Sequence, residues 1–250
     1  MPSSLHTIDD VLAELDHIVA HTVEQNTPLG VFAYVYRRTT AKIKEGLEKG
    51  LFSDKEKLER FDVAFAKRYI DAYWQHYNNE PPTLSWQASF EAAGRPITLL
   101  QHTMMGMNAH INLDLGIVAA EAAPGDHIHE IKADFMLVNQ ILEELIDEMQ
   151  ERLSRVSRLM ILIDWAGGRT DESVVNFSIR RARDFAWLNA RNLAYLEGQE
   201  RAQYIQTVDE QIAALARHIA YPRGRFLRTC LRCVQFFEEK QVARVIQLLQ

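Results

Sequence analysis

The stretch LQHTMMGMNAHINLDLG, from Leu100 to Gly116, is mostly apolar and yet carries six side chains that resist burial. On a helix at about 100° per residue, its apolar side chains point in every direction around the axis, which is typical of a buried helix. The stretch therefore predicts a central helix over 97–121. Around that helix the sequence predicts a single all-α domain over 1–250, a bundle of about 8–10 helices.

Capping and turn residues divide the rest of the chain. Thr27-Pro28 is typical of a helix start, Ser53 with Glu56 forms a capping-box pattern, and Pro124-Gly125 marks a turn. No segment shows the sustained alternation of a strand. We predict helices over 8–25, 28–49, 54–78, 84–93, 97–121, 126–153, 155–166, 171–197, 199–220 and 223–249.

Two polar stripes run along the predicted central helix. The first consists of His102, His110 and Asp114, and the second of Gln101, Asn108 and Asn112. Burying an unpaired amide or imidazole costs on the order of 1–3 kcal/mol, and a carboxylate costs more. These groups therefore need partners from neighbouring helices, water or a ligand, and we expect them to be buried.

Two interpretations of the stripes remain open. A hydrogen-bond network that fixes the helix register would use the same residue types. Alternatively, His110-x3-Asp114 places two ligands one turn apart on one face, as a metal or substrate site requires.

The segment after the central helix offers partners for the first stripe. Asp134 falls within the apolar face of the helix predicted over 126–153, and His127 shares that face if the helix begins so early. A short Pro-Gly turn favours antiparallel packing of this helix on the central one. The candidate metal ligands are His110, Asp114, His127 and Asp134, for zinc, manganese or iron. His102 and Asp134 are the candidate catalytic residues that move protons.

Arg68 lies within the buried arc of the helix predicted over 54–78. It could form an ion pair with a carboxylate of the first stripe, bind an anionic substrate, or lie at the rim with its charge in water. With Gln101, His102, Asn108 and Asn112, it completes the candidate polar network.

Composition limits the classes of function. The net charge of −6 argues against a nucleic-acid partner bound through bulk charge. No leader opens the chain, and no apolar run approaches the roughly 20 residues of a membrane span, so we expect a cytoplasmic protein. A small-molecule ligand fits the polar stripes, and a homo-oligomer remains open. The basic segment from Arg217 to Arg232 could hold a phosphate, or form a solvated face balanced by Glu238 and Glu239.

The quoted stretch, with FAKRYIDAYW at 65–74 and ARDFAW at 182–187, resembles a bacterial domain family of unknown function with the signature NAHINLDLG, here 108–116. That resemblance implies a single all-helical domain and supplies no activity. His110-x3-Asp114 is also similar to an element of the zinc-dependent phospholipase C and P1-type nuclease superfamily, which implies a metal-assisted hydrolase.

Our hypothesis is therefore an all-α protein with a buried His/Asn/Asp site that binds a divalent metal or a small polar ligand, as a metal-assisted hydrolase would. The alternative is a non-enzymatic binding or structural protein whose polar stripes are a hydrogen-bond network. Whether the protein is an enzyme remains open at this point.

Overall fold

The computed structural model describes residues 5–52, 54–138 and 179–250, and across these ranges the chain is all-α, with no strand. The longer helices are α1 (Ile8–Glu24), α2 (Leu29–Glu48), α3 (Lys55–Tyr77), α4 (Leu84–Glu91), α5 (Leu99–Ala109), α6 (Leu115–Ala122), α9 (Ile179–Leu193), α10 (Gly198–Ala220), α11 (Arg225–Phe237) and α12 (Val242–Leu249). The predicted fold class is confirmed.

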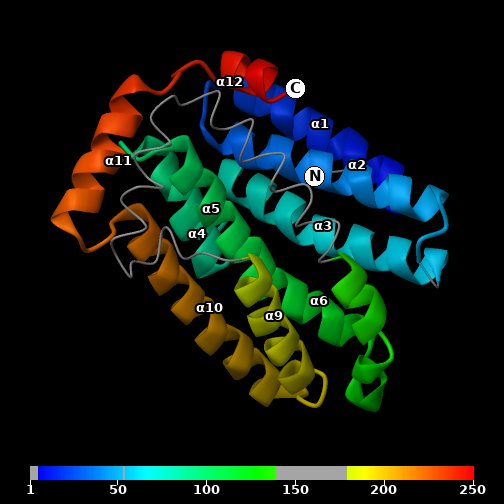
Figure 1. Ribbon diagram of the computed structural model, residues 1–250. Coiled ribbons are helices and arrows are strands. Elements are labelled where there is room, and N and C mark those ends of the chain that lie inside the picture. The colour runs from blue at the N-terminus through cyan, green and yellow to red at the C-terminus, as the bar shows by residue number, and fades with distance from the viewer. Residues whose placement is uncertain (1–4, 53, 139–178) are drawn as a thin grey trace.

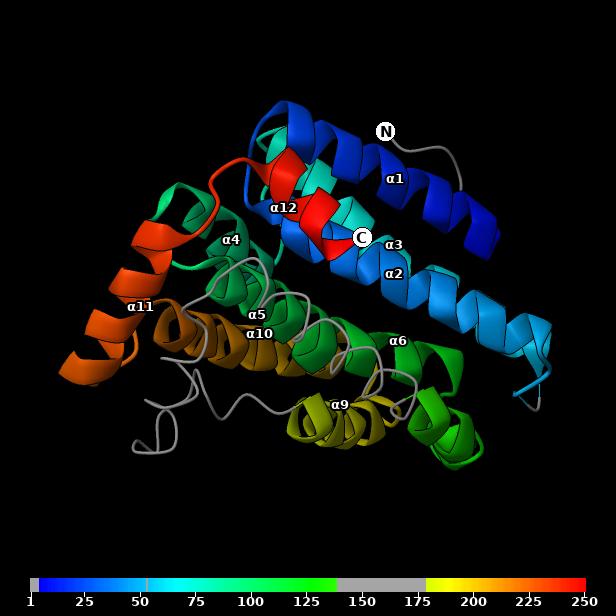
Figure 2. The same ribbon diagram turned by 45° about the horizontal axis from the view of Figure 1, so that its top comes forward.

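The helices form layers on either side of the α5–α6 rod (Figures 1 and 2). On one side lie α1, α2 and α3, with α12 packed on α2. On the other side lie α9 and α10, and α4 packs against both α5 and α10. The rod is therefore surrounded by helices, as its apolar circumference requires.

The central rod begins at Thr98, whose side chain forms a capping box with Gln101. The carboxylate of Glu238 also accepts a hydrogen bond from the Leu99 amide at 3.0 Å, so a distant acid satisfies another free N–H of the first turn. From Leu99 to Ala120 every described residue is buried except Leu100 and Met107, which are half-buried. The prediction of a buried central helix is confirmed over Leu99–Ala120, whereas Ile97 and Thr98 precede the helix and Glu121 is exposed.

The rod is not α-helical throughout, because His110–Asp114 forms a single π-helical turn between α5 and α6. Such a turn inserts an extra residue into the hydrogen-bond ladder, so successive residues in it rotate by less than the usual 100°. The uniform 100° spacing assumed from the sequence therefore fails at the residues of greatest interest. π-helical turns are frequent at functional sites.

Two predicted helices differ from the structure. Instead of a helix from 126, the chain forms a 3-10 turn over Gly125–His129, and a helix begins only at 132. Pro124 and Gly125, with Gly125 at φ +61°, set this tighter geometry. The helix predicted over 223–249 is two helices, since extended residues follow Phe237. The helix predicted over 155–166 and parts of two others lie outside the described residues.

Close helix packing requires glycine at Gly106. A Cβ atom there would lie 2.6 Å from Cγ of the buried Phe32 ring, which a rigid aromatic ring can avoid only by moving. Phe32 belongs to α2, so Gly106 sets the distance between α2 and the rod. Among the described helices, none combines the length and apolar character that a membrane crossing demands.

Candidate functional site

The second polar stripe is hydrogen-bonded to α10. The Gln101 amide donates to the carbonyl oxygens of Ile219 and Ala220, at 2.7 and 3.0 Å. Those carbonyls end α10 and have no partner within that helix. The Asn108 amide donates to the carbonyl of Ile212 at 3.0 Å and accepts from Asn112 at 2.9 Å. This stripe therefore attaches the rod to α10.

The first stripe contains a histidine–aspartate pair at the π-helical turn. His110 Nδ1 lies 3.0 Å from Asp114 Oδ2, and their side chains are 3% and 1% exposed. The indole N–H of Trp86, on α4, donates to the same Asp114 oxygen at 2.9 Å. Arg68 Nε lies 3.5 Å from the other Asp114 oxygen, with its side chain 34% exposed. Of the three interpretations of Arg68, the ion pair with a carboxylate of the stripe is the one observed.

Aromatic rings surround the His110 imidazole. Phe65 from α3 stacks on it with ring centroids 3.7 Å apart, and Tyr36 from α2 meets it edge-on at 4.5 Å. Phe32, Tyr69 and Trp86 complete the shell. The sequence predicted partners from the segment after the rod, but this shell comes from α2, α3 and α4.

This arrangement fixes the protonation of His110. Burial lowers the pKa of His110, and the hydrogen bond to Asp114 raises it in partial compensation. In the neutral imidazole, the nitrogen that faces Asp114 carries the proton, which leaves the lone pair on Nε2. Nε2 is buried and has no hydrogen-bond partner among the described residues. Nε2 of His110 can therefore accept a hydrogen bond.

One oxygen of Asp62, on α3, is also buried without a hydrogen-bond partner among the described residues. The buried hydroxyls of Tyr36 and Thr40, on α2, lie close enough for Thr40 to act on Tyr36 through a side-chain hydrogen bond. Burial raises the pKa of Asp62 to about 7, with a further contribution from Glu59. Burial also raises the pKa of Tyr36, and the charges of Asp62 and Asp114 act in the same direction. We call Tyr36, Thr40, Asp62 and His110 the interior cluster.

The sequence prediction missed the α2 and α3 members of the interior cluster. A signal was present for Asp62, because on a helix it falls between Phe65 and Tyr69 on one side and Ile70 on the other, in the middle of the buried arc of α3. A lone acid in an apolar arc needs a partner or a raised pKa. Tyr36 carried no such signal, since a tyrosine in an apolar segment is ordinary core.

His102, a candidate catalytic residue, lies on the rod two turns before His110 and is 5% exposed. Its Nδ1 atom has no hydrogen-bond partner among the described residues, and burial lowers its pKa to about 4. It is therefore neutral near pH 7. Asn112 is equally buried, so the predicted burial of His102, His110, Asn112 and Asp114 is confirmed.

The predicted four-residue metal cluster is not formed. His127 lies on the 3-10 turn at the surface, with its side chain 71% exposed and 2.8 Å from Glu130. Asp134 is half-buried on the short helix that begins at 132. Nowhere in the described ranges do three or more His, Cys, Asp or Glu side chains gather as metal ligands would. The 3-10 turn replaces the helix that would have turned His127 toward the rod.

Comparison with curated proteins and with solved structures gives no match. A family model described as "Family of unknown function (DUF5995)" matches residues 8–222, which include the rod and every residue of the interior cluster. The resemblance to a domain family of unknown function is thereby supported, whereas the similarity to the nuclease superfamily is not. Since the match spans most of the chain, this protein belongs to the DUF5995 family of unknown function.

Proposed function

We propose that the protein binds a small polar molecule at the interior cluster, and that His110 accepts a proton from it. The observation that carries the proposal is the unpartnered, buried Nε2 of His110, whose opposite nitrogen is held by Asp114. A histidine oriented by a carboxylate, with its second nitrogen free, is the arrangement of a general base. In a purely structural pair, both nitrogens would normally find partners.

The polar atoms near His110 indicate which hydrogen-bonding groups a ligand would need. Nearly all buried polar groups have hydrogen-bond partners, so the unpartnered Nε2 of His110 and Oδ2 of Asp62 favour a bound water or small molecule between the helices that carry them. His110 Nε2 needs a donor, and the Tyr36 hydroxyl can donate to an acceptor. Asp62, with a pKa near 7, can supply or take a proton at neutral pH. A small molecule that carries both a donor and an acceptor, such as an amide or an alcohol, fits these groups.

The metal-assisted version of the hypothesis receives less support from the described residues. A catalytic zinc site uses three protein ligands, and only His110 and Asp114 are adjacent here. Asp114 is in addition already engaged by Trp86 and His110. We therefore assign the chemistry to proton transfer.

The test uses nitrogen NMR of the histidine side chains in the intact protein. Acetamide and methanol carry a donor and an acceptor, whereas dimethyl sulfoxide carries only an acceptor. We expect acetamide or methanol, at about 100 mM because such small probes bind weakly, to shift the Nε2 resonance of His110. Dimethyl sulfoxide should leave that resonance unchanged.

The variants His110→Gln and His218→Gln complete the test as a matched pair. His218 is half-buried on α10 and bonds to the carbonyl of Ala214 at 2.9 Å, outside the interior cluster. The probes should raise the melting temperature of the wild type and of His218→Gln, but not that of His110→Gln. Equal effects on both variants, or no effect of either probe on the wild type, would overturn the proposal.

A further inference from the structure

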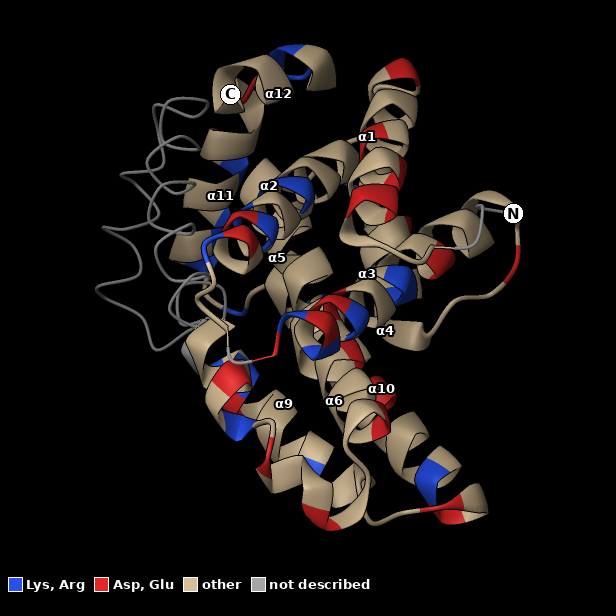
Figure 3. Cartoon of the chain, turned by 90° about the vertical axis from the view of Figure 1, so that its right-hand side faces the viewer, with Lys and Arg blue, Asp and Glu red and all other residues tan. Residues whose placement is uncertain are grey.

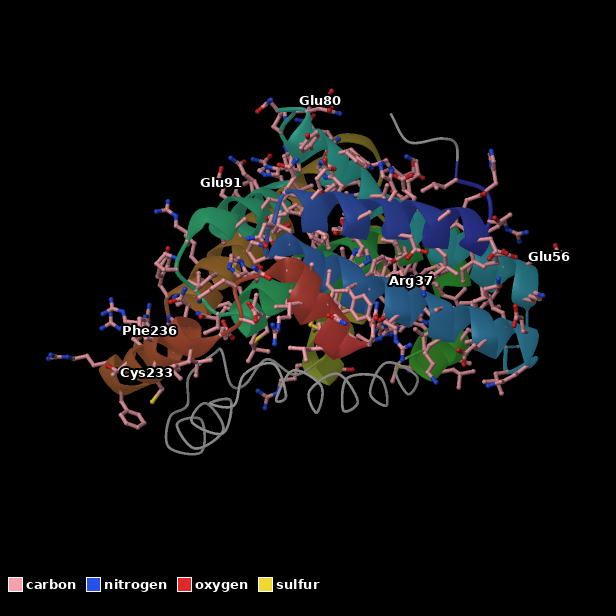
Figure 4. All side chains as sticks on the ribbon, turned by 90° about the horizontal axis from the view of Figure 1, so that it is seen from above. Arg37, Glu56, Glu80, Glu91, Cys233 and Phe236 are labelled. Atoms are coloured by element: carbon pink, nitrogen blue, oxygen red, sulfur yellow. The ribbon has the colours of Figure 1, made fainter. Side chains whose placement is uncertain are left out.

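Helix α11 presents two different faces. Its inner face consists of Leu227, Cys230, Leu231 and Val234, which are buried and pack with Leu100 of the rod. Its outer side chains include Phe236 and Phe237, which are 75% and 70% exposed. Figure 4 shows Phe236 and Cys233 at one end of the molecule, pointing away from its body. The inner face thus holds α11 on the rod, while two phenyl rings at its C-terminal end are exposed to solvent.

The outer face is also strongly basic. Arg225, Arg228 and Arg232 are exposed, and the sequence of α11 contains no acidic residue. Projected on a helix, these arginines form one stripe beside Phe236. The chain as a whole has a net charge of −6. Helix α1 has the opposite composition to α11, since it carries acids and no Lys or Arg (Figure 3). The outer face of α11 therefore carries positive charge that no acid of the same helix balances.

The acids expected to balance this face are engaged elsewhere. Glu238 is buried, where its carboxylate accepts from the amide of Leu99. Glu239 accepts from the amides of Lys240 and Gln241 and lies 3.3 Å from Arg244. In the described part of the chain, no ion pair joins Arg225, Arg228 or Arg232 to an acid. The face is thus exposed to solvent, as one sequence-based alternative expected, but Glu238 and Glu239 do not pair with it.

We infer that the outer face of α11 docks on an anionic lipid bilayer, with Phe236 and Phe237 in the interfacial layer and the three arginines on lipid phosphates. Amphipathic helices with basic and aromatic side chains bind membranes in this way, lying in the plane of the interface. Anionic lipids attract each nearby arginine, and the apolar layer removes phenyl rings from water. This docking is independent of the chemistry at the interior cluster.

A bilayer fits this face better than a nucleic acid does. Base stacking requires flat aromatic platforms that lie open to successive bases. The rings of Phe236 and Phe237 instead meet edge-to-face at 86°, with centroids 5.1 Å apart. Together they form an apolar wedge, which suits insertion between lipids.

The experiment is co-sedimentation of the full-length protein with vesicles. We expect binding to vesicles of phosphatidylcholine with about 30% phosphatidylglycerol, weak binding to phosphatidylcholine alone, and release at high salt. The double variant Arg228→Gln/Arg232→Gln should weaken binding roughly 25-fold, since each arginine near such a surface contributes about fivefold. Phe236→Ser/Phe237→Ser should also abolish tight binding, and it should fold because both rings are exposed.

Matched controls use exposed residues elsewhere. Lys42→Gln/Lys49→Gln removes two exposed charges of α2 and its C-cap, and Leu188→Ser/Tyr195→Ser removes two exposed apolar side chains from α9 and the turn after it. Both control variants should bind vesicles as the wild type does. Loss of binding in the controls, no loss in the α11 variants, or binding to RNA or polyglutamate without binding to vesicles would each overturn the inference.

Discussion

The imidazole of His110 lies flat on the phenyl ring of Phe65, with centroids 3.7 Å apart and planes 6° from parallel. The stack restricts tilting of the imidazole, and the bond from Nδ1 to Asp114 restricts its rotation. Phe65 is itself packed edge-on against Tyr36, the nearest member of the interior cluster on α2. The orientation of the His110 imidazole is therefore set by the protein itself, which is what the proposed role as a proton acceptor requires.

His110 should remain neutral at a pH where exposed histidines are charged, because burial lowers its pKa. In Asp114→Asn, the pKa of His110 should fall further, since the carboxylate is the group that raises it. Histidine NMR titrations of both proteins measure this directly. An ordinary titration of His110 near pH 6.5 would contradict its burial as a neutral base.

Asp62 makes the stability of the folded protein depend on pH. Its pKa is 3.8 in a model peptide and about 7 when folded, so the folded state binds the proton more tightly. Its contribution to stability is complete below pH 4 and is lost as the pH rises through 7. Asp62→Asn should therefore be more stable than the wild type at pH 8, by on the order of 1–3 kcal/mol.

Urea denaturation at pH 5 and pH 8 measures this effect, with Asp71→Asn as the control. Asp71 lies on the same helix, and its exposed carboxylate pairs with Lys67, so the control should change stability by less than about 0.5 kcal/mol. If Asp62→Asn instead lost stability at pH 8, the carboxylate would have to be ionised and paired.

Gly106→Ala should destabilise the protein by about 1–3 kcal/mol, because the new methyl group would meet the Phe32 ring at 2.6 Å. Phe32 also contacts His110, so the His110 resonances should shift. Gly94→Ala is the matched control, with nothing within 4 Å of its added Cβ. Thermal melts that show equal effects for the two variants would exclude the packing role of Gly106.

Gln101→Met keeps the length of the side chain and removes its amide. Since the carbonyls of Ile219 and Ala220 would lose their donor and the Thr98 amide would lose its capping acceptor, we expect a loss of about 1–3 kcal/mol. Gln206→Met serves as the control, because Gln206 is exposed and bonds only to Glu210 among the described residues. A loss below about 0.5 kcal/mol at Gln101, measured by urea denaturation, would show that this attachment of α10 contributes little.

Metal analysis tests the hypothesis of a zinc, manganese or iron site. Because only two candidate ligands are adjacent, we expect less than about 0.1 metal ion per chain in protein purified without a nickel column. One equivalent of metal that is lost in His110→Gln would contradict this expectation and restore the metal-assisted hydrolase.

The helical fold and the burial of the rod could be predicted because both depend on local sequence. Apolar residues around the whole circumference of 97–121 require neighbours on every side, whatever those neighbours are. Helix starts were predicted well where the signal is local, as at Thr27-Pro28, directly before Leu29, the first residue of α2. Helix boundaries were predicted poorly where the geometry differs from an α-helix, as at the 3-10 turn after Pro124 and the π-helical turn at His110.

The sequence by itself determined that six polar side chains of the rod would be buried and would need partners. Only the tertiary structure decided which of them found partners in the protein. Gln101 and Asn108 reach backbone carbonyls of α10, more than a hundred residues away, whereas His110 faces α2 and α3 with one nitrogen unpartnered. The physical reason is that burial follows from the composition of one helix, but hydrogen bonding requires an atom of another helix at the right distance and angle.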